Sequence, residues 1–164
     1  WWGRYLEAAP SNWFGGNSDP RMIWCTLNAD IIYSFLPDVQ SGLKDARSTS
    51  EAIGYGARNT AQMAATCDSG AAVAAEGYRG GAKADWYIPS FNELTILKSS
   101  PAAASLSAAP YWSSTEDRAL KYNAMGTNIG GGSMATSECL GDSANSTTAS
   151  QKGCYLSVRP VRAF

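Results

Sequence analysis

The sequence predicts an α+β fold in a single domain. Three observations favour this class: alanine-rich segments with helical spacing occupy the middle of the chain, short aromatic and β-branched runs occur outside it, and 164 residues is the usual length of one domain. We expect a small mixed or antiparallel sheet, short helices and a long C-terminal loop region. The domain covers 1–164, and its start, Trp-Trp-Gly-Arg, is neither an initiator Met nor a signal peptide, which indicates a longer or processed chain.

The first third of the chain is divided by turn-forming residues. Segment 3–10 alternates loosely and stops at a proline, as a first strand would, and 11–21 is a loop by its Gly, Asn and Asp-Pro content. Segment 22–25 reads as a short buried run. Residues 28–36 form either a short helix or a strand, because the apolar run inside them is too brief for periodicity to decide.

The middle of the chain has helical character. Two short helices are expected over 60–67 and 70–76, separated by an Asp-Ser-Gly break. A third helix begins after Ser90. Because Glu93 stands three residues later, the two side chains are placed to form a capping box, in which each accepts a hydrogen bond from the other residue's backbone N–H.

The last third has strand character. Segments 85–88, 111–114 and 154–164 are rich in aromatic and branched residues. In 154–164 the apolar positions change parity at Pro160, which predicts a bulge or an edge position, since proline cannot donate to a ladder. The intervening segment 116–153 is rich in Gly, Ser and Asn. A loop of that length is either functional or disordered.

Composition excludes several functions. The absence of histidine removes Ser-His-Asp and Cys-His catalysis, and it also removes His-ligated zinc or haem. A formal net charge of -1 provides no general field toward nucleic acid or anionic lipid. No stretch approaches the ~20 apolar residues of a membrane span. We therefore expect a protein that is not an enzyme, binds no nucleic acid and does not insert into membranes.

The four cysteines predict disulfides in an oxidising compartment. Cys25, Cys67, Cys139 and Cys154 show no Cys-x-x-Cys spacing, which argues against a zinc ribbon or a redox pair. An even number with wide spacing fits two disulfides, and three pairings are open. Cys139–Cys154 is favoured because the Ser-, Asn- and Gly-rich segment between these cysteines has nothing else to order it. Four free buried thiols are the alternative.

Several blocks occur in a fixed order along the chain. They include Tyr-Leu-Glu-Ala-Ala-Pro at 5–10, Asp-Trp-Tyr-Ile-Pro-Ser at 85–90, Tyr-Trp-Ser-Ser at 111–114 and Val-Arg-Pro-Val-Arg at 158–162. In this order the sequence closely resembles the DUF1566 family, over nearly the whole chain. That family includes the C-terminal domain of the Legionella collagen-like adhesin and is grouped with C-type-lectin-like folds.

The resemblance implies a C-type-lectin-like domain whose two chain ends lie close together and whose loops at one end carry recognition. Such domains are known in bacterial surface proteins and in phage structural proteins. In the Legionella relative the domain tops a trimeric collagen-like stalk and binds sulfated polysaccharide. Sequence diversity in the family concentrates after the Tyr-Trp-Ser-Ser-x-Glu block. The matching positions expected to face a ligand are Asp117, Arg118, Lys121, Tyr122, Asn123 and Asn128.

The blocks that carry the resemblance have a plain physical interpretation as scaffold. Trp86, Trp112 and Phe164 offer large apolar areas for a single core. Arg159 and Arg162 are expected to pair inside the fold. The acidic partners proposed for them are Glu93 and Glu116.

We expect no bound cofactor. The chain lacks the Glu-Pro-Asn or Gln-Pro-Asp loop and the Trp-Asn-Asp strand of calcium-dependent sugar-binding lectins. A calcium site is the alternative. This ion needs six to eight oxygen ligands, some of which carboxylates supply. The carboxylates available for it are Glu116 with Asp117, and Glu138 with Asp142.

These expectations describe a non-catalytic recognition or adhesion domain on a bacterial surface protein or phage particle, located outside the cell, at the cell surface or on the virion. Its partner is a glycan or protein receptor bound through loops in 116–152. A polyanion would need Arg118, Lys121 and Lys152 on one face, so a neutral glycan or a protein is favoured. A solvated loop without a ligand is the simplest alternative.

The main alternative function is structural. The chain would then be a subunit or decoration module of a fibre, tail or capsid that acts through self-association, as a homotrimer or another homo-oligomer. In that case the aromatic dipeptides at 1–2 and 13–14 would be buried between subunits.

Overall fold

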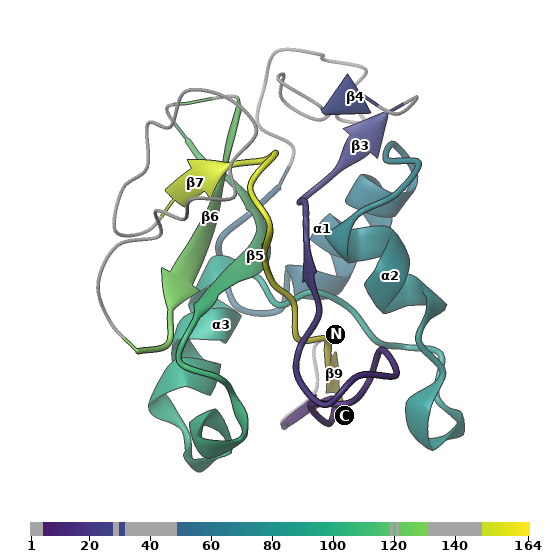
Figure 1. Cartoon of the computed structure of the whole chain (residues 1–164), viewed down its shortest axis with the longest axis vertical. Coiled ribbons are helices and arrows are strands. Elements are labelled where there is room, and N and C mark those ends of the chain that lie inside the picture. The colour runs from purple at the N-terminus through teal and green to yellow at the C-terminus, as the bar shows by residue number, and fades with distance from the viewer. Residues whose placement is uncertain (1–4, 28–29, 32–48, 119, 121, 131–148) are drawn as a thin grey trace.

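The protein is an α+β domain, as the sequence predicts. The computed structural model describes residues 5–27, 30–31, 49–118, 120, 122–130 and 149–164 (Figure 1). Its helices are α1 (Gly56–Ala64), α2 (Ala71–Gly77) and α3 (Phe91–Ser99), with the 3-10 turns η1 (Gly80–Ala82) and η2 (Pro101–Ser105). Its strands are β1 (Leu6–Ala8), β2 (Arg21–Met22), β3 (Thr26–Leu27), β4 (Asp30–Ile31), β5 (Pro110–Glu116), β6 (Asn123–Asn128), β7 (Ala149–Gln151), β8 (Leu156–Ser157) and β9 (Val161–Ala163).

The largest sheet is mixed. Its five strands lie in the order β2-β8-β5-β6-β7, and β5 pairs antiparallel with β6 but parallel with β8. The β5–β6 register shifts between Trp112 and Glu116. Strands β1 and β9 pair antiparallel, with Leu6 opposite Ala163, so the first and last strands meet at the lower end of the molecule in Figure 1.

The helices follow the local sequence signals. Helices α1 and α2 occupy the two alanine-rich segments, with α1 starting a few residues before the predicted range and α2 shifted by a single residue. The capping box before α3 is confirmed. The backbone N–H of Ser90 donates to Glu93 Oε2 at 2.8 Å, and the backbone N–H of Glu93 donates to Ser90 Oγ at 3.4 Å.

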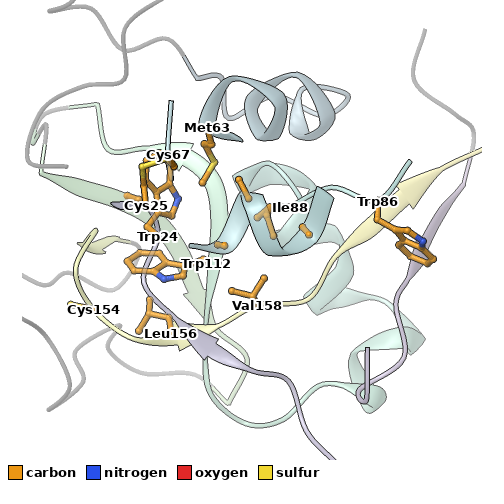
Figure 2. Close-up of a cluster of buried hydrophobic side chains, with 14 of the residues drawn as sticks. Trp24, Cys25, Met63, Cys67, Trp86, Ile88, Trp112, Cys154, Leu156 and Val158 are labelled. Atoms are coloured by element: carbon orange, nitrogen blue, oxygen red, sulfur yellow. A yellow bond between two sulfur atoms is a disulfide. The ribbon is translucent and has the colours of Figure 1, made fainter. Parts of the chain in front are cut away.

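The core is built around buried tryptophans (Figure 2). Trp24 and Trp112 are 0% and 1% exposed, and each indole N–H bonds a carbonyl of the surrounding backbone. Trp86 is also buried, but Figure 2 shows it apart from the other two, on the far side of the cluster. The prediction that Trp86 and Trp112 belong to the core is confirmed. The prediction for Phe164 is wrong, because its side chain is 57% exposed at the chain end.

Three strand predictions need correction. Segment 85–88 is not a strand: Tyr87 alone forms a bridge, to Val161, with two 2.8 Å hydrogen bonds. Segment 154–164 divides into β8 and β9, which belong to different sheets on either side of Pro160. The expected loop 116–153 contains β6 and β7, because pairing with the neighbouring strands stabilises their backbone despite their small and polar side chains.

The arginine pairing is internal, but the predicted acidic partners are wrong. Arg159 Nε and Nη2 donate to the two carboxylate oxygens of Asp19, at 2.5 and 2.7 Å, in a fully buried pair. Arg162 donates to Glu7 at 2.9 Å and lies 3.4 Å from Asp85. Glu93 instead forms the capping box with Ser90 at the start of α3. The folding of β1 and of 11–21 onto the C-terminal strands, which local sequence does not indicate, brings these partners together.

A disulfide joins Cys25 to Cys67, across a sequence separation of 42 residues. It links the segment before β3 to the end of the α1 region, and both cysteines are buried. Cys154 is disulfide-bonded as well. The predicted Cys139–Cys154 pairing lies outside the described residues, because Cys139 does, as do Trp1, Trp2, Glu138 and Asp142.

Candidate functional site

The turn between β5 and β6 holds the sequence-predicted ligand positions. Asp117 closes it: its Oδ1 accepts from the backbone N–H of Leu120 at 2.9 Å, and its own N–H donates to the carbonyl of Asn123 at 3.0 Å. This turn lies at the upper end of the molecule in Figure 1, away from the β1–β9 pair. Lys121, another predicted ligand position, lies outside the described residues.

A loop that precedes α1 is fastened to the end of β5 beside this turn. Asn59 bonds both backbone groups of Ser50, accepting from its N–H at 3.0 Å and donating to its carbonyl at 2.6 Å. Thr115 Oγ1 donates to the same carbonyl at 3.0 Å, and the N–H of Glu116 donates to Thr49 Oγ1 at 2.8 Å. These bonds fix the loop although it has no regular secondary structure.

An exposed ion pair joins the loop to the turn. Arg118 Nη2 lies 2.8 Å from Glu51 Oε1, and the side chains are 77% and 36% exposed. The carbonyl of Glu51 accepts from the backbone N–H of Asn92 at the start of α3. We call Glu51, Asp117, Arg118 and Tyr122 the turn surface, because these residues lie at this end on two segments of the chain and are half-buried or, for Arg118, exposed.

A buried ion pair lies beneath the turn surface. Lys152 Nζ is 2.6 Å from Glu116 Oε1, with both side chains 0% exposed, and the ammonium group lies 4.8 Å from the centre of the Trp24 ring. Burial lowers the pKa of Lys152, and the neighbouring Glu116 carboxylate partly opposes this effect. The backbone N–H of Lys152 also donates to the carbonyl of Tyr122 at 2.9 Å, which ties β7 to the turn.

These positions correct part of the predicted site. Lys152 is not available to a polyanion, and Glu116 is not a surface carboxylate for calcium, because the two are buried against each other. Asn123 is 1% exposed within β6, so it does not face a ligand. Asn128 lies at the other end of β6, where its Oδ1 accepts from the N–H of Gly130, so it is not part of the same cluster.

The structure therefore brings together Asp117, Arg118 and Tyr122 and adds Glu51, which the sequence did not indicate. Glu51 is separated from Arg118 by 67 positions in the chain. No motif surrounds it, so only the folded loop reveals its place.

In the described part of the chain, no group of three or more His, Cys, Asp or Glu side chains is placed to hold a metal ion. None of the helices in those same residues has the length and apolar character needed to cross a membrane.

Comparison of the chain with protein-family models, curated proteins and solved structures found no match in any of the three. The resemblance to the DUF1566 family and to C-type-lectin-like folds therefore stays a prediction.

Proposed function

We propose that this chain is a non-catalytic recognition domain of the C-type-lectin-like, DUF1566-like kind, displayed on a bacterial surface protein or phage particle. Its ligand is a glycan or a protein receptor, and it binds at the turn surface and the loops that follow in 116–152. The observation that carries the proposal is the exposed Arg118–Glu51 pair, which two separate segments present above the buried Glu116–Lys152 pair.

This arrangement suits recognition because the variable part is exposed and its support is rigid. Binding residues are often found on loops that a well-packed scaffold holds in place. Here the support is a network of hydrogen bonds from α1, α3 and β5, together with the ion pair against Trp24. Substitutions on the turn surface therefore leave the core intact.

The charges of the turn surface favour a neutral glycan or a protein over a polyanion. The guanidinium of Arg118 is offset by the carboxylate of Glu51 at 2.8 Å and by Asp117 one position away. Lys152, which would have supplied a second cation, is buried. The Cys25–Cys67 disulfide supports an extracellular location, because such bonds persist in oxidising compartments.

A glycan array that includes sulfated polysaccharides, probed with and without a chelator, tests this function. Proteins immobilised from candidate host surfaces provide the receptor arm. We expect binding that survives chelation and weakens in Arg118→Ala but not in the control Ile96→Ala, which changes an exposed residue of α3. Binding confined to sulfated ligands, or equal binding by both variants, would contradict the proposal.

Self-association is the second candidate function, and one observation favours it. Phe14 is 58% exposed beside hollows over α2 that Val73 and Ala74 also line. Its neighbour Trp13 is buried and bonds the carbonyl of Val158, so only Phe14 of this dipeptide is available to a second copy. Light scattering at several concentrations tests this function: a monomer throughout argues against it, and an oligomer that Phe14→Ala dissociates supports it.

A further inference from the structure

A hollow distinct from those beside Phe14 lies at the opposite end of the molecule from the turn surface. Its volume is about 570 Å³, within the range typical of small-molecule sites. Residues of the α2 end, of the segment before α3 and of the chain end line it, among them Glu76, Arg79, Asp85, Trp86, Tyr87 and Phe164. We call it the chain-end hollow, because Phe164 follows β9 directly.

The aromatic wall of this hollow is fixed in place. The indole N–H of Trp86 donates to the carbonyl of Gly80 at 3.1 Å, and the ring packs against Tyr78 with centroids 5.2 Å apart. Phe164 exchanges two 3.1 Å backbone hydrogen bonds with Tyr5. The backbone of Phe164 is therefore held, its ring lies 6.0 Å from that of Tyr5 between centroids, and the residue as a whole is 57% exposed.

A buried arginine stiffens the same wall. The Arg162 guanidinium lies 5.1 Å from the centre of the Phe164 ring and 6.0 Å from that of Trp86, and its ion pairs with Glu7 and Asp85 hold it there. Because this cation already lies close to both rings, the wall is an unfavourable site for a second cation.

The polar rim carries charges of both signs. Glu76 and Asp85 contribute carboxylates to it, and Arg79, an exposed residue, donates from its guanidinium to the backbone carbonyls of Glu76 and Tyr78. Burial raises the pKa of Glu76, which Arg79 partly offsets. Two carboxylates and the Arg79 guanidinium line the hollow, and Arg162 behind it offsets the charge of Asp85 at 3.4 Å, so the rim offers hydrogen-bond donors and acceptors without a net field toward an anion or a cation.

We propose that the chain-end hollow binds a neutral pyranose unit of a glycan, as a second site independent of the turn surface. A pyranose has an apolar C–H face that packs on an exposed aromatic ring, here Phe164, and hydroxyl groups that both donate and accept. Those hydroxyls match the mixed rim of Glu76, Asp85 and Arg79. Charged saccharides fit less well, because each sign of charge meets a like charge in the rim.

Methyl glycosides of glucose, galactose, mannose and N-acetylglucosamine, titrated singly into the whole chain and followed by NMR, test the proposal. We expect at least one to bind, and we expect Phe164→Ala to weaken its affinity about fivefold or more. Phe14→Ala is the matched control, since Phe14 is 58% and Phe164 57% exposed; it is expected to change the affinity less than twofold.

Glu76→Gln provides a second readout should Phe164→Ala fail to fold, because Glu76 lines the hollow at the end of α2 and is exposed. It is expected to weaken the same glycoside severalfold at an unchanged melting temperature. The proposal is overturned if none of the four glycosides binds, or if binding persists unchanged in the folded variants. Binding that responds to Arg118→Ala instead would overturn the chain-end site while leaving the turn surface supported.

Discussion

Replacing Lys152 with methionine tests the buried Glu116–Lys152 pair without changing any residue of the turn surface above it. The substitution keeps most of the side-chain volume and removes the ammonium group that lies 2.6 Å from Glu116 Oε1. With both side chains 0% exposed, it leaves a buried carboxylate without its cation. Breaking a buried pair in this way costs about 3–5 kcal/mol, a large part of the ~5–15 kcal/mol that stabilises a typical domain.

Equilibrium unfolding in urea, followed by tryptophan fluorescence, measures this loss. Trp24 is a suitable reporter because its ring centre lies 4.8 Å from Lys152 Nζ. The double variant Lys152→Met with Glu116→Leu is the matched control, since replacing both members by apolar residues is often neutral or stabilising. We expect the double variant to unfold within about 1 kcal/mol of the natural chain. Two results would contradict this expectation. One is a free energy of unfolding that falls by less than about 1 kcal/mol in Lys152→Met, and the other is a loss in the double variant as large as the losses of the two single variants added together.

The same pair gives a pH dependence with a defined sign. Burial places the pKa of Lys152 in the folded chain below its ordinary value of 10.5, so the unfolded chain binds more protons between the two values. The contribution of Lys152 to the free energy of unfolding therefore rises with pH across that window. Lys152→Met is expected to lack this rise. If the free energy of unfolding of both chains depended on pH in the same way, this expectation would be wrong.

Three other outcomes follow from described contacts. Removing the disulfide by Cys25→Ala with Cys67→Ala should lower the free energy of unfolding by about 4 kcal/mol, the value of the chain-entropy model for a loop of this length. Urea titration measures this loss, and a loss below about 1 kcal/mol would contradict the model. Burial raises the pKa of Tyr87 and Tyr111 above the usual 10. Their contribution to the free energy of unfolding is therefore fully present below pH 10 and is lost as the pH rises above it. Absorbance titration should find both rings un-ionised until the chain unfolds. Arg118→Ala should change the free energy of unfolding by no more than about 1 kcal/mol by the same urea titration, because the pair with Glu51 is exposed, and a larger loss would make the turn surface part of the scaffold.

Local signals in the sequence predicted local structure well. The capping box is an example: Ser90 and Glu93 are three residues apart, and the hydrogen bonds that join them depend only on the first turn of α3. The alanine-rich helices follow for the same reason, since spacing along one segment fixes which side chains share a face.

Contacts between distant segments were not predictable in this way. Arg159 pairs with Asp19 across 140 positions, and the hydroxyl of Tyr111 donates to the same carboxylate at 2.6 Å. Nothing near Asp19 distinguishes it from the other acidic residues. Its role depends on how 11–21 folds over β8 and β5, which is a property of the whole topology.

The site shows the same limit. The resemblance placed Asn123 at the surface and the polar composition placed Lys152 there, but Asn123 pairs within β6 and Lys152, which follows β7, is buried against Glu116. Arg118 was found from the resemblance, whereas Glu51 became visible only in the fold. Polar residues in a Gly- and Ser-rich segment thus give little information about burial, because sheet hydrogen bonds alone can order such a segment.

Recognition at this turn is tested by the affinity of the chain for the strongest ligand on the array, measured with and without the double substitution Arg118→Ala with Tyr122→Ala. Melting temperatures of the two proteins are recorded alongside. We expect binding to be weaker by about tenfold or more at a nearly unchanged melting temperature, because the turn surface lies outside the buried Glu116–Lys152 pair. Unchanged binding in the double variant would contradict recognition at this turn.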